Sequence, residues 1–63
     1  MKIDTEKLRQ TIKENGLTIE QAAEKMGMSR VRLQMILKNE STRLSAVDQI
    51  ANGIGLDPKD ILI

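Results

Sequence analysis

The sequence contains no cysteine, no histidine and no aromatic residue among its 63 residues. Without cysteine no disulfide can form, and the redox compartment is left unconstrained. The absence of both cysteine and histidine removes the side chains that dominate zinc sites and nucleophile activation. We therefore expect no metal and no cofactor. We also expect no enzyme, because the spacing of the remaining lysines, carboxylates and serines does not suggest a catalytic dyad.

The lack of aromatic side chains also bears on binding. Proteins that bind RNA or single-stranded nucleic acid stack bases on aromatic rings, and this chain has none. Long apolar runs are missing too, so we expect no membrane span. The start of the chain, MKIDTEK, has acids and no apolar segment of the kind that a secretory signal needs. These features predict a cytoplasmic protein with no membrane partner and no small-molecule substrate.

The length allows one domain, residues 1–63. Net charge is only +1, but the charges are unevenly distributed. From Lys25 to Arg43 there are five bases and one acid, Glu40, whereas the remainder holds five bases and eight acids. Such a cluster indicates a phosphate-binding surface. A solvated helix face explains the same charge placement equally well.

Two short helices are predicted in the middle of the chain. Ala22, Ala23 and Met26 recur at the spacing of one helical face, and Thr18 with Gln21 has the pattern of a capping box. The first of these helices therefore begins near residue 19.

The turn between the two helices is marked by glycine. Gly27 ends the first helix because glycine accepts positive φ without a steric penalty, and Ser29 is a good N-cap for a second helix over residues 30–38. The stripe expected to face inward consists of Leu33, Ile36 and Leu37. The opposite stripe mixes three bases, an amide and two apolar tips, and comprises Arg30, Val31, Arg32, Gln34, Met35 and Lys38.

Another helix is expected on each side of this pair. Asp4 or Thr5 caps a first helix that runs to about Glu14. Asn39 follows the second central helix, in a position suited to the left-handed conformation. Residues 39–43 then form a polar loop.

The last third of the chain predicts two more helices. Ser45 and Asp48 have the pattern of a capping box, and Gly55 ends the helix that they open. Asp57, followed by proline, begins a short terminal helix to about Leu62. The sequence thus predicts an all-α fold of five helices with no strands.

Two helices joined by a short turn containing glycine form a helix-turn-helix. The segment LTIEQAAEKMGMSRVRLQMILKNE resembles that of lambda-type phage repressors, Cro proteins and the xenobiotic-response-element class of bacterial regulators. The segment LSAVDQIANGIGLDPKDIL is similar to the fourth and fifth helices of that family. The matching positions in the motif are Leu17, Thr18, Ala23, Gly27, Met28, Ser29, Leu33 and Ile36. The resemblance implies a compact five-helix, lambda-repressor-like DNA-binding domain whose helices 2 and 3 form a helix-turn-helix at about residues 18–38.

Three positions depart from the family pattern. Many relatives pair an arginine in the first helix with a glutamate near the end of the third, where this chain has Ile12 and Leu37. Replacing both charges together avoids a desolvation cost. Ile19 stands where the family often has a glutamine that contacts phosphate.

The resemblance implies that the helix after Ser29 reads the major groove of DNA. Base-reading positions map onto Arg30, Val31 and Met35, with Gln34 as a neighbour. Arginine pairs with guanine, glutamine with adenine, and apolar tips with the thymine methyl group. Phosphate contacts are expected from Thr18, Ser29, Arg32, Lys38, Ser41, Thr42 and Arg43.

The leading hypothesis is a sequence-specific transcriptional regulator of double-stranded DNA, of the phage or mobile-element repressor or Cro-like kind. Relatives bind palindromic operators as dimers, and Ile61, Leu62 and Ile63 are candidates for self-association. Alternatively, these three residues fold back onto the first helix, or the chain is the head of a longer protein. The rival function is a protein-interaction module, an antitoxin, antirepressor or docking domain, with Ile19, Val31 and Met35 as its contact patch.

Overall fold

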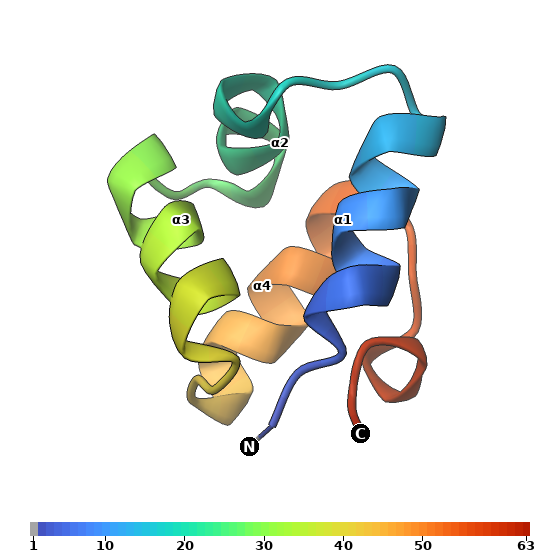
Figure 1. The fold of residues 1–63 in the computed structure, drawn as a ribbon, viewed down its shortest axis with the longest axis vertical. Coiled ribbons are helices and arrows are strands. Elements are labelled where there is room, and N and C mark those ends of the chain that lie inside the picture. The colour runs from blue at the N-terminus through green and yellow to red at the C-terminus, as the bar shows by residue number, and fades with distance from the viewer. Residues whose placement is uncertain (1) are drawn as a thin grey trace.

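The computed structural model describes residues 2–63, which form four α-helices and one 3-10 turn (Figure 1). The elements are α1 (Thr5–Glu14), α2 (Ile19–Met26), α3 (Arg30–Asn39), α4 (Leu44–Ile54) and η1 (Pro58–Asp60). Strand-like pairing within residues 2–63 is limited to two isolated bridges. The all-α prediction is therefore confirmed, but the predicted number of five α-helices is wrong.

The N-terminal ends of α1 and α2 are capped as the sequence predicts. Oδ1 of Asp4 accepts a hydrogen bond from the backbone N–H of Lys7 at 3.1 Å. Oγ1 of Thr18 accepts from the N–H of Gln21 at 3.1 Å, and Oε1 of Gln21 accepts from the N–H of Thr18 at 2.9 Å. These bonds satisfy N–H groups that have no partner inside the helix.

The turn between α2 and α3 also follows the prediction. Gly27 ends α2 in the left-handed conformation, with φ of +72°. Two residues later, Oγ of Ser29 accepts a hydrogen bond from the N–H of Arg32 at 3.1 Å and caps α3. Only Gly27, Met28 and Ser29 therefore separate the two helices.

The end of α3 differs from the prediction. Asn39 is the last helical residue, and Glu40 takes the left-handed conformation with φ of +58°. The carbonyl of Glu40 accepts a hydrogen bond from the N–H of Ile3 at 2.9 Å. The prediction for Asn39 was wrong because the N-terminal segment, far away in sequence, sets where α3 ends.

The start of α4 is a second correction. The helix begins at Leu44 with Arg43 at the N-cap position, and no side chain caps it. The predicted capping box of Ser45 and Asp48 is therefore wrong, and both residues are exposed within the helix. The preceding loop is short, and Ser41 in it is held in an antiparallel bridge to the N-terminal segment. The helix begins directly after this tethered loop, earlier than the local pattern indicates.

The C-terminal segment is the third correction. In place of the short helix predicted from Asp57 to about Leu62, there is a single 3-10 turn, Pro58–Asp60, which Asp57 caps. The chain then extends so that Leu62 pairs with Ile3 in an antiparallel bridge. Pairing with the N-terminal segment replaces a further helical turn.

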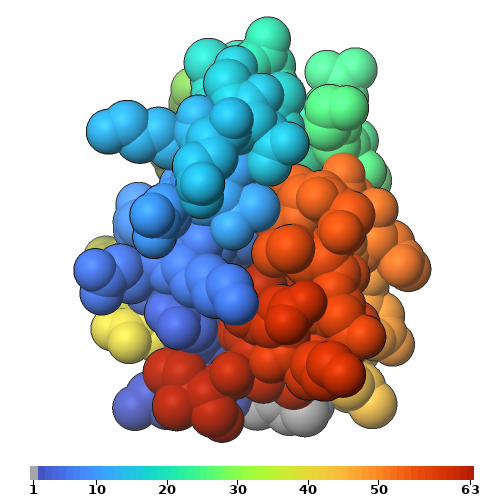
Figure 2. Space-filling model, turned by 90° about the vertical axis from the view of Figure 1, so that its right-hand side faces the viewer, coloured from blue at the N-terminus to red at the C-terminus, as the bar shows by residue number. Residues whose placement is uncertain are grey.

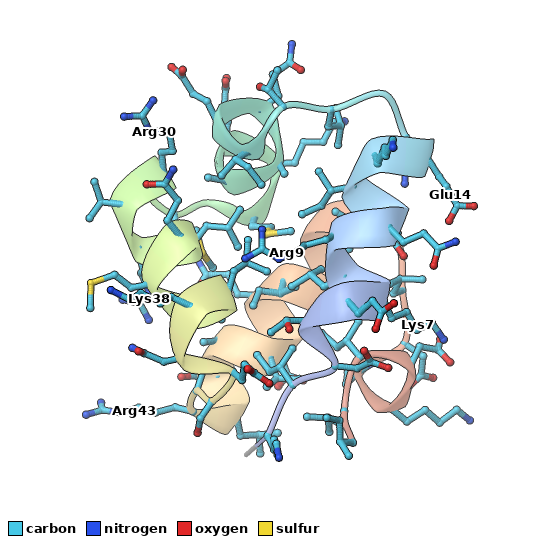
Figure 3. All side chains as sticks on the ribbon, viewed as in Figure 1. Lys7, Arg9, Glu14, Arg30, Lys38 and Arg43 are labelled. Atoms are coloured by element: carbon cyan, nitrogen blue, oxygen red, sulfur yellow. The ribbon has the colours of Figure 1, made fainter. Side chains whose placement is uncertain are left out.

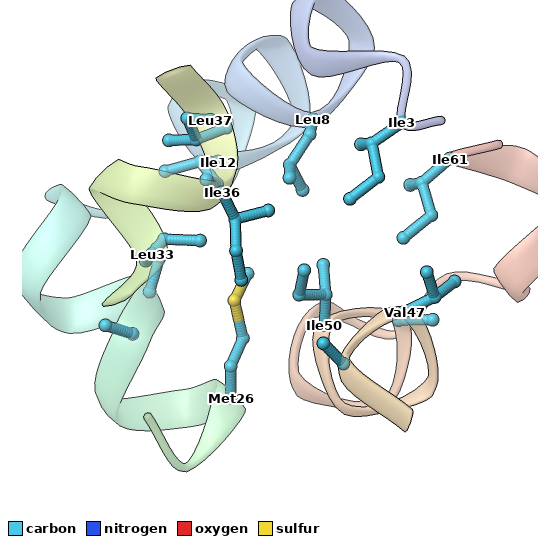
Figure 4. Packing of buried hydrophobic residues seen from close by; sticks show 14 residues of the cluster. Ile3, Leu8, Ile12, Met26, Leu33, Ile36, Leu37, Val47, Ile50 and Ile61 are labelled. Atoms are coloured by element: carbon cyan, nitrogen blue, oxygen red, sulfur yellow. The ribbon is translucent and has the colours of Figure 1, made fainter. Parts of the chain in front are cut away.

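A single apolar cluster lies between the four helices and the C-terminal segment (Figure 4). Ile12 and Leu37, which replace the ion pair of many relatives, are each 3% exposed within this cluster. Apolar side chains at both buried positions avoid the desolvation cost of burying an ion pair there. The buried residues are Ile3, Leu8, Ile12, Ala22, Ala23, Met26, Leu33, Ile36, Leu37, Ala46, Val47, Ile50, Ala51 and Ile61.

The helices place α3 on one side of the molecule, with α1 and the C-terminal segment on another (Figure 1). Figure 2 shows the side formed by α1, the end of α4 and the C-terminal segment. The two ends of the chain lie close together at one end of the molecule (Figure 1). Within residues 2–63, no helix has the length and apolar character needed to cross a membrane.

Candidate nucleic-acid interface

The third helix has one buried face and one exposed face. Leu33, Ile36 and Leu37 are buried in the core, as the sequence predicts. On the opposite face Val31 is 62% exposed and Met35 is 55% exposed. Two large apolar side chains left in solvent on a small domain are a candidate contact surface.

The polar members of this face are exposed as well. Arg30, Arg32, Gln34 and Lys38 all have exposed side chains. Figure 3 shows Arg30 and Lys38 projecting from α3 on the side away from α1. The structure therefore brings the four predicted base-reading positions onto one outer surface, together with Arg32 and Lys38. This surface, formed by Arg30, Val31, Arg32, Gln34, Met35 and Lys38, is called the α3 face below.

An open groove runs beside the C-terminal half of α3. Arg32 and Met35 of the α3 face line one part of it, and Arg43 lies in the loop that follows. Figure 3 shows Arg43 extending on the same side of the molecule as Lys38. The full lining consists of Arg32, Met35, Ile36, Asn39, Ser41, Thr42 and Arg43. The loop residues that the sequence predicts as phosphate contacts thus adjoin the α3 face.

Asn39 is a member of this groove that the sequence prediction missed. It was assigned to the turn, whereas the structure makes it the last residue of α3 with an exposed side chain. Its position continues the outward stripe, because Val31, Met35 and Asn39 follow one another at intervals of four residues. That spacing was visible in the sequence and identifies Asn39 as part of the same surface.

Two hydroxyl groups stand at helix N-termini, where backbone N–H groups favour anions. The Ser29 and Thr18 oxygens each accept a backbone hydrogen bond within their own cap. A hydroxyl that accepts one bond retains its own proton for donation. Both residues are exposed, so each hydroxyl remains accessible to an external acceptor.

Two predicted contributors lie elsewhere. Ile19 is partly buried and packs against the core, so only part of its side chain is available to a partner. Lys25, counted in the basic cluster of the sequence, lies on α2 and lines depressions with Leu17 and with Gly53. The bases that gather around α3 are therefore Arg30, Arg32, Lys38 and Arg43.

Comparison with known proteins points to the same motif. A family model described as helix-turn-helix matches residues 8–61, which is most of the chain. No curated protein and no solved structure matches the chain significantly.

Proposed function

Because this chain belongs to the lambda-type repressor and Cro-like helix-turn-helix family of DNA-binding regulators, we propose that it reads specific double-stranded DNA sequences with α3. The family is generally non-enzymatic. We propose a regulator of the phage or mobile-element repressor or Cro-like kind, with residues 1–63 acting as one DNA-binding domain in the cytoplasm.

The observation that carries this proposal is the composition of the α3 face. It is a continuous exposed strip of one helix, and it combines bases, an amide and two apolar tips. An α-helix fits the major groove of B-DNA, where each base pair presents a distinct set of donors, acceptors and methyl groups. The bases, the amide and the apolar tips of the α3 face can each contact one of these groups. The apolar tips in particular suit the groove better than they suit bulk solvent.

The proposed base contacts follow from side-chain chemistry. The Arg30 guanidinium donates two hydrogen bonds to O6 and N7 of guanine, and the Gln34 amide pairs with adenine. Val31 and Met35 have no hydrogen-bonding group that discriminates bases, so they contact thymine methyl groups.

The proposed phosphate contacts lie partly on the α3 face and partly beside it. Arg32 and Arg43 line the groove beside α3, and Lys38 projects nearby. The hydroxyls of Ser41 and Thr42 in the same loop, and those of Ser29 and Thr18 at two helix N-termini, add neutral donors. Such contacts position a protein on the duplex without reading its sequence.

Dimerisation is part of the proposal, because one helix reads only a few base pairs. Two copies on half-sites about 34 Å apart read a palindromic operator. Ile61 is buried in the core and has no surface to offer, which corrects its predicted place in the self-association surface. Ile63 is 76% exposed and Leu62 is partly buried, so these two residues remain candidates for the contact between copies.

The test is selection of bound duplexes from a random pool, followed by mobility-shift titration of the winning sequence against random duplex. We expect an enriched palindromic sequence that binds at least about 10³-fold more tightly than random duplex. If no sequence is enriched at salt between about 50 and 200 mM, the DNA-reading proposal is refuted.

A protein-interaction module is the second candidate. Val31 and Met35 are exposed apolar side chains, and methionine is common on adaptable contact surfaces. In that case a partner captured by the chain is lost with Met35→Glu and retained with Arg30→Ala. Equal loss with both variants argues against an apolar contact patch.

A further inference from the structure

A side chain of α4 forms a hydrogen bond with the turn of the helix-turn-helix. Nε2 of Gln49 donates a hydrogen bond to the backbone carbonyl of Gly27 at 2.9 Å. Only the amide nitrogen can make this bond, because a carbonyl oxygen cannot donate. The bond joins residues 22 positions apart, whereas the cap bonds at Thr18 and Ser29 join residues three positions apart.

The local hydrogen bonds of the turn tie it to α2 and not to α4. The N–H groups of Gly27 and Met28 both donate back into α2, with Met28 reaching the carbonyl of Ala23 at 3.0 Å. These bonds fix where α2 ends. The Met28 N–H and the Gly27 carbonyl share one planar peptide unit, so the Met28 bond also fixes that peptide relative to α2.

The Gln49 bond ties the same peptide to α4. The carbonyl of Gly27 belongs to the peptide unit that leads into Met28, at the end of α2, where carbonyls lack helical partners. The peptide that leads towards α3 is therefore held from both edges, by α2 through its N–H and by α4 through its carbonyl. One helical turn along α4, Gly53 brings the same helix against Met26, so α4 contacts α2 just before the turn as well.

We propose that Gln49 is a positioning residue for DNA recognition, which sets the orientation of α3 relative to the rest of the domain by holding the Gly27 carbonyl. This inference rests on the proposed function of the α3 face. Gln49 itself touches no base. It acts because base contacts at Arg30 and Gln34 require the helix to enter the groove at one angle, whereas phosphate attraction tolerates several.

The test compares Gln49→Met, which keeps the length of the side chain and removes the donor, with Gln49→Lys, which retains a donor. Gln10→Met, at an exposed position of α1, is the matched control. For each variant the affinity for the selected operator is divided by the affinity for random duplex. We expect Gln49→Met to lower this ratio about fivefold, as for one lost hydrogen bond. Gln49→Lys and Gln10→Met should stay within twofold of the parent chain.

A measurement without DNA separates this proposal from the proposed function. Residual dipolar couplings of backbone amides report the direction of each helix in the free protein. In Gln49→Met we expect the couplings of α1 and α4 to agree with the structure of the parent chain, whereas those of α3 should deviate from it. The melting temperature should fall by no more than about 8 °C. A parent chain that prefers no duplex refutes the proposed function, and the couplings still decide whether Gln49 orients α3.

The proposal is overturned by any of three results. The first is an unchanged ratio for Gln49→Met. The second is a failure of Gln49→Lys to restore the ratio, since donation would then not be the cause. The third is a set of α3 couplings that Gln49→Met leaves unchanged.

Discussion

Gly53 of α4 lies against the backbone of Met26 in α2. A Cβ atom built on Gly53 would approach Cγ of Met26 at 2.6 Å and its Cα at 2.7 Å. Real Cβ atoms essentially never come this close to another heavy atom. The absence of a side chain at Gly53 therefore sets how closely α4 and α2 pack.

Gly53→Ala is expected to destabilise the domain, although alanine is the better helix former. The gain in helix propensity is about 1 kcal/mol. Overpacking a tight contact costs about 1–3 kcal/mol, and here the obstacle includes backbone atoms that cannot rotate away. Urea unfolding followed by circular dichroism measures the balance. Asn52→Ala, at an exposed position of the same helix, is the control and should be neutral or stabilising. A gain with Gly53→Ala would contradict the close approach.

Glu40→Gly is expected to stabilise the domain. Glu40 has φ of +58°, where an L side chain costs roughly 1–2 kcal/mol and glycine is free of that strain. The greater entropy of glycine in the unfolded chain offsets part of the gain, which leaves roughly 0.5–1 kcal/mol. Thermal unfolding of Glu40→Gln isolates the effect of charge, because glutamine keeps the strain. If both variants shift the melting temperature equally, backbone strain is not the cause.

Ile61 and Ile63 should respond differently to truncation. Ile61 is fully buried and Ile63 is 76% exposed. Ile61→Ala leaves a cavity and should cost about 2–4 kcal/mol, and Ile61→Val should cost about 0.5–1.5 kcal/mol if the alanine variant does not fold. Ile63→Ala should change the free energy of unfolding by less than about 0.5 kcal/mol. Similar costs at the two positions would mean that the C-terminal segment packs differently.

Arg30 and Lys38 should differ in how they affect DNA binding. Arg30→Ala is expected to relax base preference at one position by about 1–3 kcal/mol, because a bidentate contact to guanine is lost. Lys38→Ala should weaken binding to all duplexes alike and reduce the salt slope by about 1. Titrations of the operator and its single-base variants at several salt concentrations distinguish the two effects. Loss of base preference with Lys38→Ala, and not with Arg30→Ala, would reverse the proposed roles.

The accuracy of the sequence predictions depends on the range of the interaction involved. The caps at Thr18 and Ser29 and the turn at Gly27 were predicted correctly, because donor, acceptor and helix start lie within a few residues. The inward stripe of α3 was also correct, since helical periodicity alone separates Leu33 and Ile36 from the exposed face.

The predictions failed where the two chain ends meet the rest of the fold. Glu40, rather than Asn39, takes the left-handed position after α3, and its carbonyl pairs with the N–H of Ile3. The terminal helix is replaced by an extended segment because Leu62 pairs with the same residue. No local pattern reveals that Ile3 lies between these two segments.

The candidate site shows the same division. Exposure of Arg30, Val31, Gln34 and Met35 follows from periodicity, but their roles on DNA remain predictions. The loop residues were named from their chemistry, and only the structure places Arg43 with Arg32 around one groove. The bond from Gln49 to Gly27 had no signal in the sequence, because a polar position on a helix does not reveal its partner.

By itself the amino-acid sequence determined the first three helices, the caps at their N-termini and the side of α3 that faces outward, because each depends on residues three or four positions apart. Only the tertiary structure decided where α3 ends, where α4 begins and which distant side chain holds the turn. Those features depend on hydrogen bonds and close contacts between segments that the folded chain brings together, and their energies do not appear in any local pattern.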